Sequence, residues 1–495
     1  MPLRLNDVNG DASVACYGFK ATSRSLKPVH LAHVVFGHTQ QTIRSPERLF
    51  KFCEKPTSTP SSELDDAFDD LFESTRDLTD ERMDQLRSAM RRVLANDNAL
   101  YNSQRGSAPT CTSDYFVINP TAGVTPGRFI YTLMSRSGGD IEDKLRLQLH
   151  DHHDAISLLF RPLVRGAEES SATIRQWEEP ELGAAFGTGR IADSFVEGYD
   201  TLEGHQKTSS GTGGVNFPRD LRRVVKFGCF AFYLYMINRH TEIAAPRDRH
   251  TRVPLVLNYT GGTDNPVADA SLNSVRLALS EIEQTARVGI MHVLDRDGYR
   301  DYSENEIREL IDDVALLDVR RKTDEKEQKD HQDFLSIFEA DRAADTFERF
   351  ANAVSDAINH SSSQFKTYTP QKTAETFAWR AGLVKPRGNR ANKRRYRPDP
   401  EIIEAVVLSV LEPDQAVSLG AFCEELRVRY GIIVGGTRDD RPHLNAWDIQ
   451  LGASATERDP LKNRNYEGFK QMLVDLGFAQ EYADGVTIVS SGDVR

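Results

Sequence analysis

The sequence predicts a multi-domain α/β or α+β protein with a mixed N-terminal body, a helical middle segment and a C-terminal winged helix. A chain of 495 residues exceeds what one hydrophobic core usually organises, which favours about three domains. Its 39% hydrophobic and 27% charged residues are typical of a folded protein. The apolar spacing also changes along the chain, from mixed patterns to helical periodicity and then to short helices followed by a hairpin.

These changes divide the chain into four predicted regions. They are a mixed α/β region at 1–165, an α/β to helical middle region at 166–380, a basic linker at 381–399 and a winged-helix-like region at 400–495. We expect residues 400–495 to be separable from the rest, because an exposed linker rich in proline and arginine makes few buried contacts.

The first half of the chain mixes strand and helix signals. Residues 12–52 carry strand and turn patterns, and 63–94 repeat apolar residues at helical spacing. Residues 114–134 indicate two strands around a glycine–proline turn. The apolar run 227–238 is about half as long as a membrane helix requires, so it predicts a buried helix or strand.

The second half has clearer element boundaries. RVPLVLNYT at 252–260 predicts a buried strand, and helices follow at 270–288, after the Ser303–Glu306 capping box, and at 334–358. Beyond the linker we expect helices at 402–411, 419–430 (begun by Ser418 and ended by Gly431) and 466–476. The tail 478–491 predicts a hairpin turning at 483–485, which completes the element order of a winged helix.

The sequence contains no complete catalytic motif, and we predict no catalytic residue, metal site or cofactor. TSSGTGGVN at 208–216 lacks the lysine and hydroxyl residue of a phosphate-binding loop. HDHHD at 150–154 offers zinc, manganese or iron ligands, but adjacent side chains diverge, and a polar helix face explains it better. DRDGYRDYSENE at 295–306 imitates a calcium loop, yet Arg300 stands where that loop needs glycine.

One enzymatic alternative stays open. Asp140, Glu142 and Lys144 are the residue types of the acid-x-lysine element of metal-dependent nucleases. That chemistry requires a strand, and the intervening Asp143 is polar where a buried strand would carry an apolar side chain. A nuclease using residues 140–154 is therefore the second interpretation, and a pure protein–protein scaffold is the third.

The segment KPRGNRANKRRYRPDP at 385–400 concentrates seven of the 62 basic residues of a chain whose net charge is -12. We expect a mobile arm in which four cations contact DNA phosphates, with Tyr396 stacking on a base or sugar. The third helix of a winged helix enters the major groove, so residues at its start and along it would contact DNA. The predicted DNA-binding residues are Lys393, Arg394, Arg395, Arg397, Lys462, Arg464, Asn465 and Lys470.

Two features favour a rival interpretation of the same region. Residues 381–495 hold 16 basic and 17 acidic residues, so the region is nearly neutral. Glu481 and Asp484 lie at the tip of the expected hairpin, where they would repel phosphates. A winged helix that docks a protein therefore remains an alternative to one that binds double-stranded DNA.

The C-terminal quarter resembles a known group of proteins. TFAWRAGLVKPRGNRANKRRYRPDP, FCEELRVRYGIIVGG and NYEGFKQMLVDLGFAQEYADGVTIV resemble the C-terminal part of accessory proteins in bacterial anti-phage defence systems. These are multi-gene, modification-linked restriction systems with an ATPase or helicase partner. The resemblance implies a non-catalytic subunit that recognises DNA or couples an ATPase to its target. It implies no catalytic residue in this chain.

The predicted location is the cytoplasm. The N-terminus, MPLRLNDVNGDASVACYG, has polar residues where a signal peptide would need an apolar segment, and no run is long enough for a membrane helix. The five cysteines are far apart and form no C-x-x-C pair, which predicts reduced structural thiols.

Overall fold

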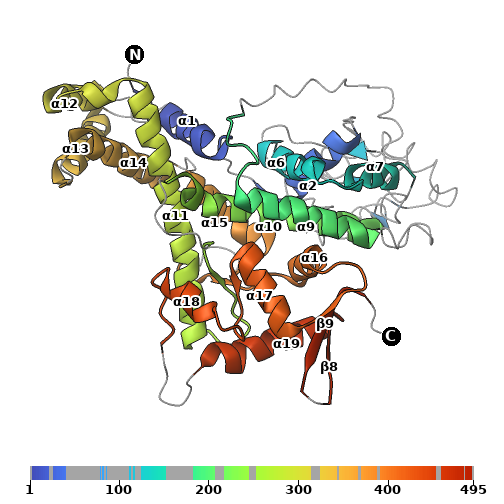
Figure 1. Cartoon of the computed structure of the whole chain (residues 1–495). Helices are drawn as coiled ribbons and strands as arrows, with labels where there is room; N and C mark the ends of the chain where they lie inside the picture. Colours follow the sequence, from blue (N-terminus) through green and yellow to red (C-terminus); the bar gives the residue numbers. More distant parts are fainter. Residues whose placement is uncertain are drawn as a thin grey trace.

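The computed structural model is mostly helical, with strands in small sheets (Figure 1). It describes residues 3–21, 26–40, 79, 81–82, 85, 111–112, 115–116, 124–151, 182–206, 217–244, 252–313, 324–342, 345–365, 369–386, 391–452, 459–483 and 485–492. The predicted mixture of helices and strands is confirmed in this coarse form. Most of the expected helix at 63–94 lies outside these residues.

The N-terminal half is more helical than expected. Its described elements are α1 (Leu5–Tyr17), α2 (Pro28–Gln40), β1 (Cys111–Thr112), β2 (Tyr115–Phe116), α6 (Val124–Arg136), α7 (Ile141–Asp151), α9 (Arg190–Gln206) and α10 (Phe217–Ile243). The prediction of strands at 12–52 is wrong over α1 and α2, and the second strand expected within 114–134 is α6 instead. In α6 the glycine and proline lie in the first turn, and Phe129, Ile130, Leu133 and Met134 face the core at helical spacing.

The middle of the chain contains β3 (Leu255–Val256), α11 (Pro266–Arg296), η2 (Tyr299–Asp301), α12 (Glu304–Asp313), α13 (Asp324–Ala340), α14 (Thr346–Phe365) and α15 (Pro370–Ala381). The single helix expected at 334–358 is divided between α13 and α14. Asp345 begins the second of them, because its carboxylate accepts a hydrogen bond from the backbone N–H of Phe347 at 3.1 Å.

The C-terminal part contains β4 (Val384–Lys385), η3 (Ala391–Lys393), β5 (Arg395–Tyr396), α16 (Pro400–Val410), β6 (Ala416–Ser418), α17 (Leu419–Tyr430), β7 (Ile432–Ile433), α18 (Asp440–Asn445), η4 (Leu461–Asn465), α19 (Tyr466–Asp475), β8 (Ala479–Glu481) and β9 (Thr487–Ser490). Strands β6, β9 and β8 form one antiparallel sheet in that order. The expected start and stop of α17 are confirmed: Ser418 Oγ accepts from Ala421 N, and Gly431 has a φ of 71°.

Helix α10 lies at the centre of the molecule, in contact with α9, α11, α15 and α16 (Figure 1). The run Phe227–Ile237 is buried on every side of this helix, which explains why it is apolar all round. Among the described residues, no helix combines the length and the apolar character needed to cross a membrane.

One hydrophobic core includes side chains from Cys16 to Val489, so it contains residues from both sides of the predicted linker. A second core joins α1, the end of α11 and helices α12 to α14. Strand β3 pairs in parallel with β7, which attaches the C-terminal part to the body at Leu255–Ile432. Residues 400–495 therefore share a hydrophobic core with the body, and the basic segment before them is not the contact-poor linker that the sequence predicted.

Candidate functional site

The described part of the basic segment is ordered against the body. β4 and β5 pair antiparallel, with Val384 opposite Tyr396. Tyr396 is buried, and its hydroxyl forms a 2.7 Å hydrogen bond with the hydroxyl of Tyr233 on α10. The prediction that Tyr396 stacks on a base is therefore wrong, because its ring is part of the core.

Two of the arginines expected on phosphates are engaged within the protein. Arg394 is 5% exposed, and its guanidinium lies 2.9 Å from the Glu375 carboxylate on α15. Arg395 donates from Nε to Ala268 O at 3.0 Å and from Nη2 to Thr263 O at 2.9 Å. These bonds attach residues 391–399 to α15 and to the start of α11, so the expectation of a mobile, solvated arm is wrong for this stretch.

The other two predicted cations of the segment, Lys393 and Arg397, are exposed. They are available to an external anion in a way that Arg394 is not. Lys385, in β4, lies 3.2 Å from the Asp399 carboxylate, so this ion pair partly neutralises the same surface.

Asn465, expected to read a base, is a fully buried structural residue. Its Oδ1 accepts from Tyr259 N at 2.7 Å, while Nδ2 donates to Leu257 O and Val434 O, each at 2.7 Å. The amide oxygen and both N–H groups are used within the protein, so the prediction of DNA contact at Asn465 is wrong.

Tyr259 contacts both the basic segment and α19, which with η4 corresponds to the predicted third helix of the winged helix. Its ring lies 5.5 Å from that of Phe469 in α19, and its hydroxyl donates to Pro398 O at 3.5 Å. The third helix approaches so closely that a Cβ on Gly468 would lie 2.1 Å from Tyr259 O. The predicted segments are thus adjacent, although several of their polar side chains face inward.

The exposed cations of the third helix are concentrated at its first turn. Lys462 and Arg464, in η4, are exposed. Lys470, one turn into α19, forms ion pairs with Glu467 at 2.6 Å and Glu481 at 3.3 Å. The hydrogen bond to Glu467 raises the pKa of Lys470, and these two acids neutralise its charge for an approaching phosphate.

The acid-x-lysine element lies on a helix. Residues 141–151 form α7, so the carboxylate and the amine are not on the strand that the nuclease interpretation requires. Lys144 forms an ion pair with Glu203, and Glu142 forms one with Arg146 at 2.7 Å. These contacts satisfy the element internally and do not favour a nuclease.

Neither suggested metal loop gathers ligands in the described residues. The cluster at 150–154 lies at the end of α7 and continues outside them. In the calcium-like segment Arg300 forms an ion pair with Asp295 at 2.5 Å, while Ser303 and Glu306 form the expected capping box. Within the described ranges, no group of three or more His, Cys, Asp or Glu residues could hold a metal ion.

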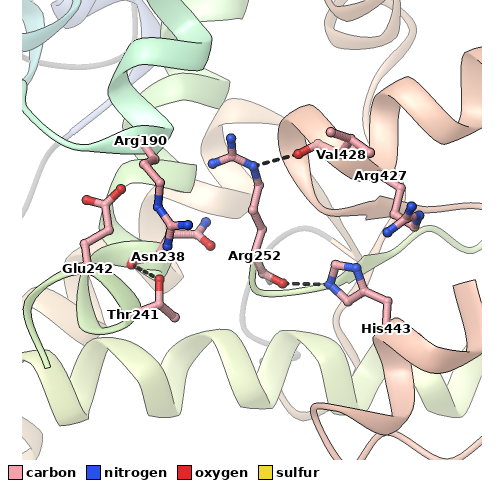
Figure 2. A pocket seen from close by; sticks show the side chains of 8 residues that line it. All are labelled: Arg190, Asn238, Thr241, Glu242, Arg252, Arg427, Val428 and His443. Carbon is pink, nitrogen blue, oxygen red and sulfur yellow. Dashed lines mark hydrogen bonds between the residues drawn. The ribbon is translucent and has the colours of Figure 1, made fainter. Parts of the chain in front are cut away.

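A cavity of about 320 Å³ lies where α9 and α10 face α17 and α18 (Figure 2). Its lining residues are Arg190, Asn238, Thr241, Glu242, Arg252, Arg427, Val428 and His443. They come from segments up to 253 positions apart (443 minus 190), and no local motif marks any of them. The site forms only where α9, α10, α17 and α18 pack together, so no pattern within one segment of the sequence indicates it.

No family model matches this chain, and neither a curated protein nor a solved structure matches it. A function for this chain therefore has to be inferred from the geometry of its own residues.

Proposed function

We propose that the protein is a DNA-binding adaptor or recognition subunit whose C-terminal part is a winged helix. The observation that carries this proposal is the order α16, β6, α17, β7, α18, η4, α19, β8, β9 with a sheet in the order β6–β9–β8. Apart from β7 and α18, which are inserted between the second and third helices, this is the element order of a winged helix. In a winged helix the first strand joins the outer side of the final hairpin in this manner, and the third helix precedes that hairpin.

The proposed contact surface is smaller than the sequence indicated. It consists of Lys462 and Arg464 at the start of the third helix, with Lys393 and Arg397 on the neighbouring segment. All four are exposed. Both segments attach to the chain at 257–259, through Asn465 on one side and Pro398 on the other. Arginine and lysine at a helix start are suited to phosphate and to guanine edges in the major groove.

The wider setting of the proposal is a multi-protein anti-phage defence complex with an ATPase or helicase partner. The resemblance of the C-terminal quarter supports it. A methyltransferase gene and an ATPase gene beside this one would agree with the proposal, and their absence from the neighbourhood would count against it.

Duplex binding is tested by fluorescence anisotropy at several salt concentrations. We expect the Lys462→Ala, Arg464→Ala double variant to weaken binding and to reduce the salt slope by about 0.9 log units per lost phosphate contact. The matched control is Lys20→Ala, Arg276→Ala, which removes two exposed cations from α11 and the segment after α1. Equal affinities of the two double variants would refute the assigned surface.

A second candidate function is docking of a partner protein by the same winged helix. Val474 on α19 and Tyr482 in the hairpin are 37% and 43% exposed, and the pairing of Lys470 with two acids lowers the positive charge beside them. Aromatic side chains at the surface are enriched in protein interfaces. This function replaces DNA binding if the wild-type protein shows no affinity for duplex DNA at low salt. It then requires that Tyr482→Ser abolish co-purification with the product of a neighbouring gene.

A further inference from the structure

The cavity between α9, α10, α17 and α18 has more positive than negative charge available to a ligand. Three guanidinium groups line it, from Arg190, Arg252 and Arg427, against the single carboxylate of Glu242. Both oxygens of that carboxylate are engaged, one by Ile191 N at 3.0 Å and the other by the Arg239 guanidinium at 2.9 Å. The carboxylate is therefore committed to holding α9 and α10 together.

Arg252 has neutral partners only. Its Nε donates to Val428 O at 2.9 Å and Nη2 to Ser194 Oγ at 2.6 Å, and no described carboxylate lies within ion-pair distance. Burial lowers the pKa of Arg252, and the nearby charge of Arg190 lowers it further, against the opposing effect of Glu242. A partly buried cation with a cationic neighbour and no paired acid is stabilised by an anion.

Arg190 adds an exposed guanidinium at the first residue of α9, on the rim of the cavity (Figure 2). Among the described residues, none forms an ion pair or hydrogen bond with the Arg190 guanidinium; Ser194 Oγ donates only to the Arg190 backbone carbonyl. Arg427 forms ion pairs with Glu424 and, at 3.7 Å, with Asp439. Of the three arginines that line the cavity, Arg190 and Arg252 are thus the two without an ion-pair partner among the described residues.

His443 supplies the second kind of interaction. It is 4% exposed, and its Nε2 lies 2.7 Å from Arg252 O. Because a carbonyl oxygen only accepts, Nε2 must carry the proton, and in the neutral ring Nδ1 is left as an acceptor. Among the described residues Nδ1 has no hydrogen-bond partner, although it is buried in the cavity wall.

We propose that this cavity binds a small phosphate monoester, with its phosphate between Arg190 and Arg252 and a hydroxyl group donating to His443 Nδ1. Guanidinium groups match phosphate oxygens in pairs, and a doubly charged monoester compensates the two unpaired arginines. Inorganic phosphate or sulfate would satisfy the arginines without filling the volume. A sugar phosphate or nucleotide also carries a hydroxyl group that can donate a hydrogen bond to His443 Nδ1. The cavity is large enough for such a ligand.

A bound ligand would contact α9 on one side and the α17–α18 part on the other, so it would bridge the body and the C-terminal region. Binding there is independent of the DNA surface proposed above, because Lys462 and Arg464 do not line the cavity. The two proposals can therefore fail separately.

The test is isothermal titration calorimetry of the full chain with ribose 5-phosphate, and with ribose and inorganic phosphate as comparison ligands. We expect ribose 5-phosphate to bind more tightly than inorganic phosphate, and ribose to show no binding. Arg190→Gln should weaken ribose 5-phosphate at least tenfold. Arg438→Gln, an exposed arginine outside the cavity lining, should change the affinity less than twofold.

Folding is controlled for by the choice of Arg190, whose exposed side chain has no described partner to lose, so Arg190→Gln should unfold at the wild-type temperature without ligand. His443→Gln provides a second variant. The glutamine Nε2 can still donate to Arg252 O, whereas its amide oxygen does not occupy the position of the imidazole Nδ1. It should reduce the preference for ribose 5-phosphate over inorganic phosphate. Binding that Arg190→Gln leaves unchanged would overturn the proposal.

A duplex bearing a 5′-phosphate is the other source of the same monoester. Binding of that duplex through Arg190, with no binding of ribose 5-phosphate, would overturn the small-ligand assignment. Binding of the small ligands, with duplex affinity unchanged in Arg190→Gln, supports it.

Discussion

Replacing Asn465 by alanine tests whether this residue is structural, as its contacts require, or a DNA-reading residue, as its sequence position suggested. The substitution removes three hydrogen bonds of 2.7 Å and leaves Tyr259 N–H and the carbonyls of Leu257 and Val434 without partners. An unsatisfied buried polar group costs about 1–3 kcal/mol. Three such groups cost roughly 3–9 kcal/mol, and because water entering the vacated space satisfies some of them, we expect about 3–5 kcal/mol.

The assay is urea unfolding followed by tryptophan fluorescence, since Trp447 is buried in the same C-terminal core. Asn463→Ala is the matched control, because Asn463 is exposed two positions earlier and its loss should cost no more than about 0.5 kcal/mol. If Asn465→Ala unfolds at the same urea concentration as Asn463→Ala, the structural role is refuted. A selective loss of sequence preference on DNA, at unchanged stability, would restore the base-reading role.

Deleting residues 400–495 should leave a fragment that aggregates or is digested rapidly by trypsin, because α16 and α17 complete the core around α10; a soluble fragment with its own cooperative transition would contradict this. Gly468→Ala should lower the free energy of unfolding by about 2–3 kcal/mol, since the new methyl group would meet Tyr259 O, whereas Gly420→Ala, in α17 with open space around it, should be neutral or stabilising in the same urea titration. Burial lowers the pKa of His443, so its neutral form stabilises the fold above the unfolded-state pKa of about 6.5, and this contribution is lost as the pH falls below that value. Thermal unfolding at pH 7.5 and 5.5 should therefore show a smaller drop for His443→Gln than for the wild-type protein, and an equal drop would exclude His443 as the cause.

The sequence was most informative where a signal and its partner are close together in the chain. The hydrogen bond that caps a helix start joins residues three positions apart, as in Ser418 with Ala421 and Ser303 with Glu306. A short stretch of sequence therefore contains the whole signal. Gly431 ends α17 for a comparable reason, because the left-handed backbone there is a property of one residue. The start and end of α17 were predictable on these grounds, whereas α18, which has no side-chain cap, was not predicted.

The N-terminal predictions are wrong where turn residues lie inside a helix. Pro126 and Gly127 are typical of a turn, but they lie in the first turn of α6, and the apolar residues after them repeat at helical spacing. The structure places Gly127 so close to α2 that a Cβ would lie 2.3 Å from the Val34 side chain. That glycine is required by helix packing, which a pattern within one segment does not reveal.

The sequence by itself determined that helices lie at α16, α17 and α19, where α17 begins and ends, and that cations are concentrated at 385–400. It did not predict α18. Only the tertiary structure decided which polar groups are available. Arg394 pairs with Glu375, and Asn465 donates to the carbonyls of Leu257 and Val434. Their residue types are also those that contact DNA, so the sequence does not show that these two side chains are engaged within the protein. The cavity is the extreme case, because Arg190 and His443 become neighbours only when α9 and α18 pack against opposite sides of one space. The charge and hydrogen-bonding needs of a side chain are fixed by its type, but the partner that meets those needs is fixed by packing between segments far apart in the chain.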